Sequence, residues 1–123
     1  MRLKCLAAML VLCLFGGFAA QAATLRVVVV ETSDTDGYVK ALAQGDALPK
    51  SKGSSRVAMR VWKARFAGDD AGAIVVSIEY PNLEALAKDD AMMASDAELS
   101  AWLKSLDKLR KIVSDSIYTE LGK

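Results

Sequence analysis

The sequence predicts an α+β fold in which a four-stranded antiparallel sheet is covered on one face by helices. The longest β signal is a pair of apolar runs, 56–66 and 73–80, that bracket a turn rich in glycine and aspartate. Runs at 25–30 and 112–121 are also rich in β-branched residues. The segments between these runs and the hairpin pair have apolar residues at helical spacing. The resulting order, β-α-β-β-α-β, is that of the split βαβ arrangement.

The run at 25–30 is expected to be an interior strand. Arg26 is its only charged residue, and a nearly continuous β-branched run is typical of a strand that is buried on both faces. Pro81 ends the second hairpin strand because proline cannot donate a ladder hydrogen bond. The mixture of alternation and β-branching at 112–121 predicts the last strand.

Helices are expected in the segments between these strands. Residues 33–36 offer several N-caps for a first helix, and Gly45 is placed to end it. Asn82 caps a second helix, and residues 95–98 have the form of a capping box that starts a third, which carries Trp102 on its apolar face. Its C-terminal end is basic, and we expect a solvated helix end formed by Lys104, Lys108, Arg110 and Lys111.

The segment at 46–55 has no apolar periodicity and contains proline, glycine, serines and lysines. One interpretation is a solvated connector. Another is a basic flap over a pocket, acting through Lys50 and Lys52. An ordered lid and a disordered crossing are both compatible with this composition.

The first residues have the form of a secretory signal peptide. Two basic residues precede an apolar run at 5–15, and small residues occupy the −3 and −1 positions if cleavage falls after Ala22. The run is shorter than the roughly 20 apolar residues of a membrane span. We therefore expect a signal peptide over 1–22, one domain over 23–123, and a periplasmic or secreted protein with no membrane attachment after cleavage. A lipoprotein acylated at Cys13 is the weaker alternative.

The composition excludes several kinds of chemistry. The chain has no histidine, and its two cysteines, Cys5 and Cys13, lie in the expected signal peptide. A histidine-ligated haem, a structural zinc site, a Ser-His-Asp triad and a Cys-His dyad are therefore excluded, and we expect no metal and no cofactor. Loss of the basic leader residues leaves the 15 acidic residues in slight excess, so nothing in the overall charge attracts a nucleic acid.

A family resemblance is carried by segments along nearly the whole mature chain. They are Arg60-Val61-Trp62-Lys63, Gly68-Asp69-Asp70-Ala71-Gly72, the strand at 74–80, Pro81-Asn82-Leu83-Glu84-Ala85-Leu86, Ala101-Trp102-Leu103 and the strand at 112–121. In their order along the chain and their residue pattern, these segments resemble the dimeric α+β barrel superfamily, whose subunits have a ferredoxin-like fold. Within it, the chain is most similar to NIPSNAP-like and antibiotic-biosynthesis-monooxygenase-like (ABM-like) domains.

The resemblance implies a homodimer whose two four-stranded sheets close into a barrel. The helices would lie outside, and each subunit would hold a ligand cavity between its sheet and its helices. Activities in the superfamily include cofactor-free oxygenation of quinol-like aromatics, haem breakdown, lactone isomerisation and plain ligand binding. The haem-degrading members use a histidine ligand, which this chain lacks.

If the hairpin turn is centred near Asp70, the pairing of its two strands suggests where a pocket lies. Trp62 then pairs with Ile78 and Arg60 with Tyr80, on the more apolar face, which we expect to meet the helices. These residues suit an aromatic, anionic or enolisable ligand. Arginine would act as a fixed cation, tyrosine as a proton carrier and tryptophan as a stacking surface. The ligand-pocket candidates are Arg60, Trp62, Tyr80, Tyr38 and Trp102. In the alternative, both tryptophans are core residues and Arg60 pairs with Glu84 or Glu79.

Three functions remain open at this point. The first is a binding or accessory domain, an exported homodimer that holds a small, partly aromatic or amphipathic organic ligand between its sheet and its helices. The second is a cofactor-free monooxygenase or isomerase acting on a small aromatic or enolisable substrate, in which Arg60, Trp62 and Tyr80 supply charge, stacking and proton transfer. The third is a structural dimerisation module without a ligand.

Overall fold

The structure is a computed structural model that describes residues 22–122. The expected signal peptide falls on residues outside the described part of the chain, apart from Ala22. The elements are β1 (Thr24–Glu31), α2 (Thr35–Gly45), α3 (Ala47–Ser51), β2 (Ala58–Lys63), η1 (Gly68–Asp70), β3 (Ile74–Tyr80), α4 (Leu83–Ser95), α5 (Ala97–Asp107) and β4 (Lys111–Thr119). This order confirms the predicted split βαβ arrangement.

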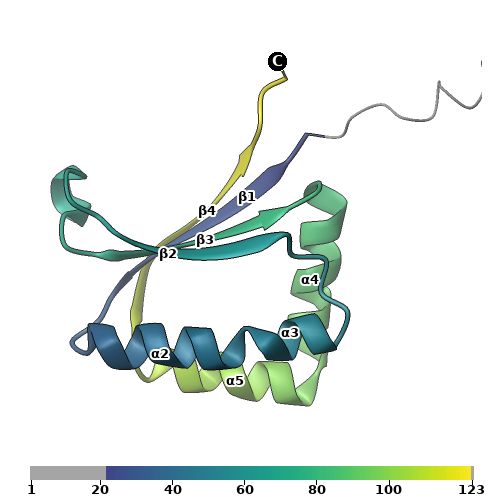
Figure 1. Ribbon diagram of the computed structural model, residues 1–123, viewed down its shortest axis with the longest axis horizontal. Coiled ribbons are helices and arrows are strands. Elements are labelled where there is room, and N and C mark those ends of the chain that lie inside the picture. Colours follow the sequence, from purple (N-terminus) through teal and green to yellow (C-terminus); the bar gives the residue numbers. More distant parts are fainter. Residues whose placement is uncertain (1–21, 123) are drawn as a thin grey trace, which may run out of the picture.

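The four strands form one antiparallel sheet in the order β2-β3-β1-β4. Helices α2, α3 and α5 form a second layer on one face of the sheet, and α4 runs along one end of the two layers (Figure 1). The strand β1 is interior, as predicted, because it pairs with both β3 and β4. The fold is therefore α+β and ferredoxin-like. Between residues 22 and 122 no helix is long and apolar enough to cross a membrane.

Short polar side chains begin the three longer helices. Asp34 caps α2 by accepting a hydrogen bond from the backbone N–H of Gly37 at 2.9 Å. Asn82 caps α4, as predicted. Asp96 caps α5 by accepting from the N–H of Leu99 at 3.0 Å, so the predicted capping box at 95–98 is wrong in its cap, and Ser95 is the last residue of α4. Such caps satisfy N–H groups that have no partner within the helix.

The hydrophobic core lies between the sheet and the helices. On the sheet side it consists of alternate residues of β1 and β3, because successive side chains of a strand point to opposite faces. These residues are Val28, Val30, Ile74, Val76, Ile78 and Tyr80, and the helices contribute Tyr38, Leu42, Leu86 and Leu106.

The segment at 46–55 contains the short helix α3 and is held against the domain. Pro49 is buried, and Lys52 donates a hydrogen bond to Asp96, the cap of α5, at 2.9 Å. Lys50 pairs with Asp46 within its own segment. Both lysines thus pair with carboxylates of the domain, and the segment packs as a connector between α2 and β2.

Gly45 is the last residue of α2, as predicted. It is not among the glycines with positive φ, so it does not end the helix through a left-handed cap. A Cβ at this position would lie 1.9 Å from Nε1 and 2.2 Å from Cε2 of Trp102. Glycine is required here because the Trp102 indole packs directly on the α2 backbone.

The connection between the hairpin strands is longer than predicted. β2 ends at Lys63 and β3 begins at Ile74, and residues 64–73 contain the 3-10 helix η1. Gly68 (φ 57°) and Gly72 (φ 88°) adopt the left-handed conformation, which glycine tolerates without strain. The turn is therefore not centred near Asp70.

This connection changes the pairing of β2 with β3. Met59 lies opposite Ile78, where we predicted Trp62. The offset is an odd number of residues, and such a shift moves every side chain of β2 to the other face of the sheet. The expectation that Arg60 and Trp62 lie on the helix-covered face is therefore wrong. Ile78 and Tyr80 do lie on that face, as predicted.

Candidate functional site

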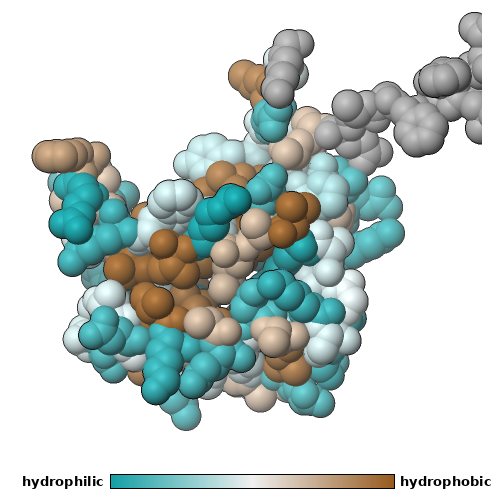
Figure 2. Space-filling model, in the orientation of Figure 1, coloured by the Kyte–Doolittle hydropathy of each residue, from teal (hydrophilic) through white to brown (hydrophobic). Residues whose placement is uncertain are grey.

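A cavity of about 420 Å³ lies between the sheet and the helices. Figure 2 shows hydrophobic residues gathered in the band between these two layers. The apolar wall of the cavity comes from all four strands and from α2, α4 and α5: Val28, Leu42, Met59, Val76, Ile78, Met93, Trp102, Leu103, Leu106 and Ile112. Charged side chains also line it: Arg26, Arg56, Arg110, Asp90, Asp107 and Asp115.

Arg26 joins three elements at one side of the cavity. Its Nε and Nη2 donate to the two carboxylate oxygens of Asp115 on β4, at 2.9 and 2.7 Å, and its Nη1 donates to Asp90 on α4. Hydrogen bonding to Asp115 raises the pKa of the Arg26 guanidinium, and the same bonds lower the pKa of Asp115. Arg26 and Asp115 are therefore charged near neutral pH, and their charges compensate each other within the protein.

Arg110 follows α5 and is the second cavity arginine. Its Nη1 donates to the hydroxyl of Tyr38 at 2.9 Å, and its guanidinium carbon lies 5.8 Å from the centre of the Tyr38 ring. Its Nε donates to Asp107 at 3.3 Å. The Arg110 side chain is only 10% exposed, whereas that of Asp107 is 58% exposed.

The third arginine, Arg56, belongs to a buried cluster with Asp89 and Tyr80. The Nε of Arg56 donates to Asp89 Oδ2 at 2.9 Å, and the Tyr80 hydroxyl donates to the same oxygen. The side chains of Arg56 and Asp89 are 6% and 1% exposed. Burial opposes the negative charge of Asp89, but hydrogen bonds from Tyr80 and Arg56 outweigh it and lower the pKa of the carboxyl group. Burial, together with Asp89, raises the pKa of Tyr80, so the phenol stays protonated.

The structure does not bring the five predicted pocket residues together. Trp102 lines the cavity. Tyr38 and Tyr80 are buried in the core, and their hydroxyls are bonded to Arg110 and Asp89.

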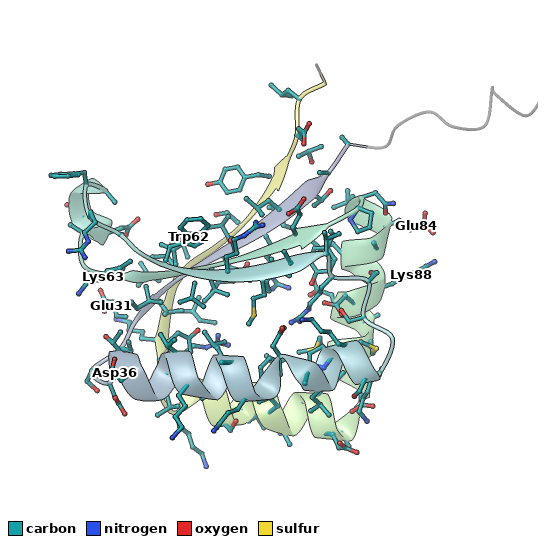
Figure 3. The ribbon with its side chains drawn as sticks, in the orientation of Figure 1. Glu31, Asp36, Trp62, Lys63, Glu84 and Lys88 are labelled. Atoms are coloured by element: carbon teal, nitrogen blue, oxygen red, sulfur yellow. The ribbon has the colours of Figure 1, made fainter. Side chains whose placement is uncertain are left out.

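Arg60 and Trp62 lie on the other face of the sheet. The indole N–H of Trp62 donates to the Ser77 hydroxyl at 2.8 Å, and Figure 3 shows the ring on the side away from the helices. Arg60 pairs with Glu79 at 3.7 Å, which confirms the alternative interpretation of that residue. The same alternative made Trp62 a core residue, which is wrong, because Trp62 is 53% exposed. The shifted pairing of β2 accounts for both positions.

Sequence reasoning missed Arg26, Arg56 and Arg110 as cavity residues. A signal for Arg26 was available, because it alternates with Val28 and Val30 and must point to the same face of β1. Arg110 was expected in a solvated basic helix end, and nothing local shows that the chain turns it onto Tyr38.

The site favours recognition of a molecule that is part apolar and part polar. Its wall is mostly aliphatic and aromatic, and three guanidinium groups, each held by side chains of the protein, also line it. In the described range 22–122, no group of three or more histidine, cysteine, aspartate or glutamate side chains is arranged to hold a metal ion.

Comparison with known proteins identifies the fold. No protein-family model and no curated protein sequence matches the chain. A solved NIPSNAP family protein from Agrobacterium tumefaciens str. C58 is similar, with 16% identity and a TM-score of 0.60 over 83% of this chain and 92% of that one. A dimeric ferredoxin-like protein from an uncultured marine organism has 11% identity and a TM-score of 0.62 over 84% and 99% of the two chains.

A third similar structure is SnoaB, a cofactor-independent oxygenase from Streptomyces nogalater. It has 10% identity and a TM-score of 0.58 over 85% of this chain and 97% of that one. At these identities the likeness establishes the fold alone. The predicted ferredoxin-like fold is confirmed, and the chain shares it with a NIPSNAP family protein, a cofactor-independent oxygenase and a dimeric ferredoxin-like protein.

Replacing Asp89 should destabilise the domain strongly. Asp89→Ala leaves the buried Arg56 guanidinium without its main partner, and we expect a loss of about 3–5 kcal/mol in the free energy of unfolding. Tyr80→Phe removes one hydrogen bond to the carboxylate and should cost about 1.5–3 kcal/mol. Urea unfolding at neutral pH measures both losses.

The control is Glu84→Ala on the same helix, where an exposed pair with Lys88 is lost; Figure 3 shows both side chains projecting from α4. Its effect should stay within about 0.5 kcal/mol. Because the folded-state pKa of Asp89 is lowered, its contribution is present at neutral pH and is lost as the pH falls through that pKa. An Asp89→Ala variant as stable as the wild type would contradict the role given to this cluster.

Proposed function

We propose that this protein is a small-ligand-binding protein that holds an organic molecule in the cavity between its sheet and its helices. The observation that carries this proposal is the cavity itself, about 420 Å³ in a domain of about one hundred residues. Its wall is mostly apolar, and six charged side chains also line it. Ligand sites of small molecules have volumes of this order and a mostly apolar wall with a few polar groups.

Charged residues on the core-facing side of the sheet support the same proposal. Arg26 alternates with the core residue Val28 along β1, and Asp115 lies opposite Val28 on β4, so both occupy positions that would be apolar in a sheet built only for packing. They line the cavity instead. A polar group on the core face is informative because it is costly unless something compensates it.

Binding is better supported than oxygenation, although SnoaB shares the fold. Abstraction of a proton from a substrate requires an available base. In the described part of the chain, every carboxylate that lines the cavity is paired: Asp90 and Asp115 with Arg26, and Asp107 with Arg110. Tyr80, the proton carrier considered from the sequence, is bonded to Asp89 and its pKa is raised.

We also propose that the protein is exported, on the basis of its N-terminal sequence. Expression with the full leader in a bacterial host should place the mature protein outside the cytoplasm. N-terminal sequencing of that protein is expected to begin at Ala23. A cytoplasmic protein that retains Met1 would contradict export.

The proposal also includes a homodimer formed through the open face of the sheet, which is the face opposite the helices. That face is apolar at its centre, as the strand pairing shows for Leu25, Val27, Val29, Trp62, Val75 and Tyr118. The side chains of Trp62 and Tyr118 are more than half exposed in the single chain. Exposed apolar area of this kind marks an interaction surface, and a similar structure is described as dimeric.

Light scattering tests the dimer. The wild-type mature chain should have the mass of two copies at micromolar concentration, and Trp62→Glu should have the mass of one, because it buries a charge in the interface. Leu83→Glu places the same charge on an exposed position of α4 and should stay dimeric. A wild-type monomer would count against this assembly.

Ligand binding is tested with phenylnaphthylamine, a neutral fluorescent probe that gains intensity in apolar sites. The wild type should bind it, and Leu103→Trp, which fills the cavity, should weaken binding at least about tenfold. The control, Leu83→Trp, makes the same change at an exposed position outside the cavity and should bind like the wild type. Equal affinity in the Leu103→Trp variant would contradict an internal site.

A further inference from the structure

We propose that the natural ligand is an amphipathic organic anion whose carboxylate or sulfonate group is received by Arg110. The inference rests on the proposed function and specifies the chemical class of the ligand. It follows from a comparison of the three arginines that line the cavity.

Two of the three are already occupied. Arg26 holds both oxygens of Asp115 at 2.9 and 2.7 Å and also donates to Asp90. Arg56 is paired at 2.9 Å with Asp89, a carboxylate that is itself buried. An anion at Arg56 would leave the buried Asp89 without its partner, which is costly. An anion at Arg26 would have to displace a bidentate pair with Asp115 as well as the contact with Asp90.

Arg110 is held more weakly by its carboxylate. Its Nε and Nη2 both lie 3.3 Å from the same oxygen of Asp107. Asp107 is largely exposed, so water can solvate it when the arginine turns to another anion. Arg110 itself is nearly buried, and a charge-assisted hydrogen bond is strongest where water is excluded.

Tyr38 fixes the Arg110 guanidinium without neutralising it. The phenol accepts one hydrogen bond at 2.9 Å and presents its ring 5.8 Å from the cation. A guanidinium has five N–H donors in a planar fork. After the bonds to Tyr38 and Asp107, donors remain for a ligand, and the fork matches the two oxygens of a carboxylate.

The wall beside Arg110 suits the rest of an amphipathic molecule. Trp102, Leu103 and Leu106 line the cavity from successive turns of α5, and Arg110 follows shortly after the helix ends. One helix thus supplies an apolar surface that leads to a cation. Two features oppose an anion here, the negative end of the α5 dipole and Asp115. The charge of Asp115 is already compensated by Arg26, and the dipole is opposed by the exposed Lys108 and Lys111.

Two probes that share one apolar body test the proposal. Anilinonaphthalene sulfonate is anionic, and phenylnaphthylamine is its neutral counterpart. Arg110→Gln should weaken binding of the sulfonate at least about tenfold and change binding of the neutral probe less than about twofold. Asp107→Asn, which removes a competing carboxylate at an exposed position, should tighten binding of the sulfonate alone.

The controls separate local from general charge effects. Lys40→Gln removes an exposed charge from α2, away from the cavity lining, and should leave both affinities unchanged. Equal losses for both probes in Arg110→Gln would overturn the proposal and assign Arg110 a purely structural role. Tighter sulfonate binding in Asp90→Asn, but not in Asp107→Asn, would place the anion at Arg26 and overturn it as well.

The same data distinguish this proposal from the proposed function. If the wild type binds the neutral probe in the cavity and binds the sulfonate probe no more tightly, the anionic ligand is refuted. The binding function remains supported in that case. A folded wild type that binds neither probe refutes both. Circular dichroism on each variant confirms that changes in affinity arise in a folded protein.

Discussion

The fold depends most on the buried Asp89 carboxylate and its two partners. Asp89 lies on α4, Tyr80 is the last residue of β3, and Arg56 precedes β2, so one charge joins a helix to two strands. Breaking a buried ion pair costs several kcal/mol, a large fraction of the stability of a domain this size. The cluster therefore fixes α4 along the end of the two layers, where Figure 1 shows it. The position of α4 in turn helps to define the space between the sheet and α5.

Alternating charges line part of the cavity in place of apolar side chains. Asp90, Arg26 and Asp115 are bonded in series, and the charge of Arg110 also lowers the pKa of Asp115. Such a chain links α4, β1 and β4 through directional contacts and leaves the middle of the cavity unfilled. The positive and negative charges of these four residues are balanced. Such an arrangement suits recognition of a polar ligand group that takes the place of one charged residue in a pair. It does not suit general base catalysis, which needs a carboxylate free to accept a proton.

Much of the fold could be predicted from local signals. The interior strand at 25–30, the cap at Asn82 and the last strand near 112–121 each depend on residues that are close in sequence. The register of β2 could not be predicted in the same way. The register depends on how residues 64–73 fold. A register error of an odd number of residues exchanges the two faces of the strand.

The candidate site was predicted less well than the fold for that reason. Arg60 and Trp62 were assigned to the pocket through a register that the structure does not have, and Trp102 alone of the five candidates lines the cavity. Arg26 could have been found by alternation with Val28. Arg110 could not, because its burial depends on a tertiary contact with Tyr38.

The central claim is that a ligand occupies the interior of the domain and not the open face of the sheet. Methyl spectra of protein labelled with carbon-13 methionine test it directly, because Met59 and Met93 line the cavity and Met92 does not. Titration with phenylnaphthylamine should shift the Met59 and Met93 signals and leave Met92 in place. Probe binding that leaves both cavity methionines unchanged would show that the ligand sits elsewhere and would contradict the account.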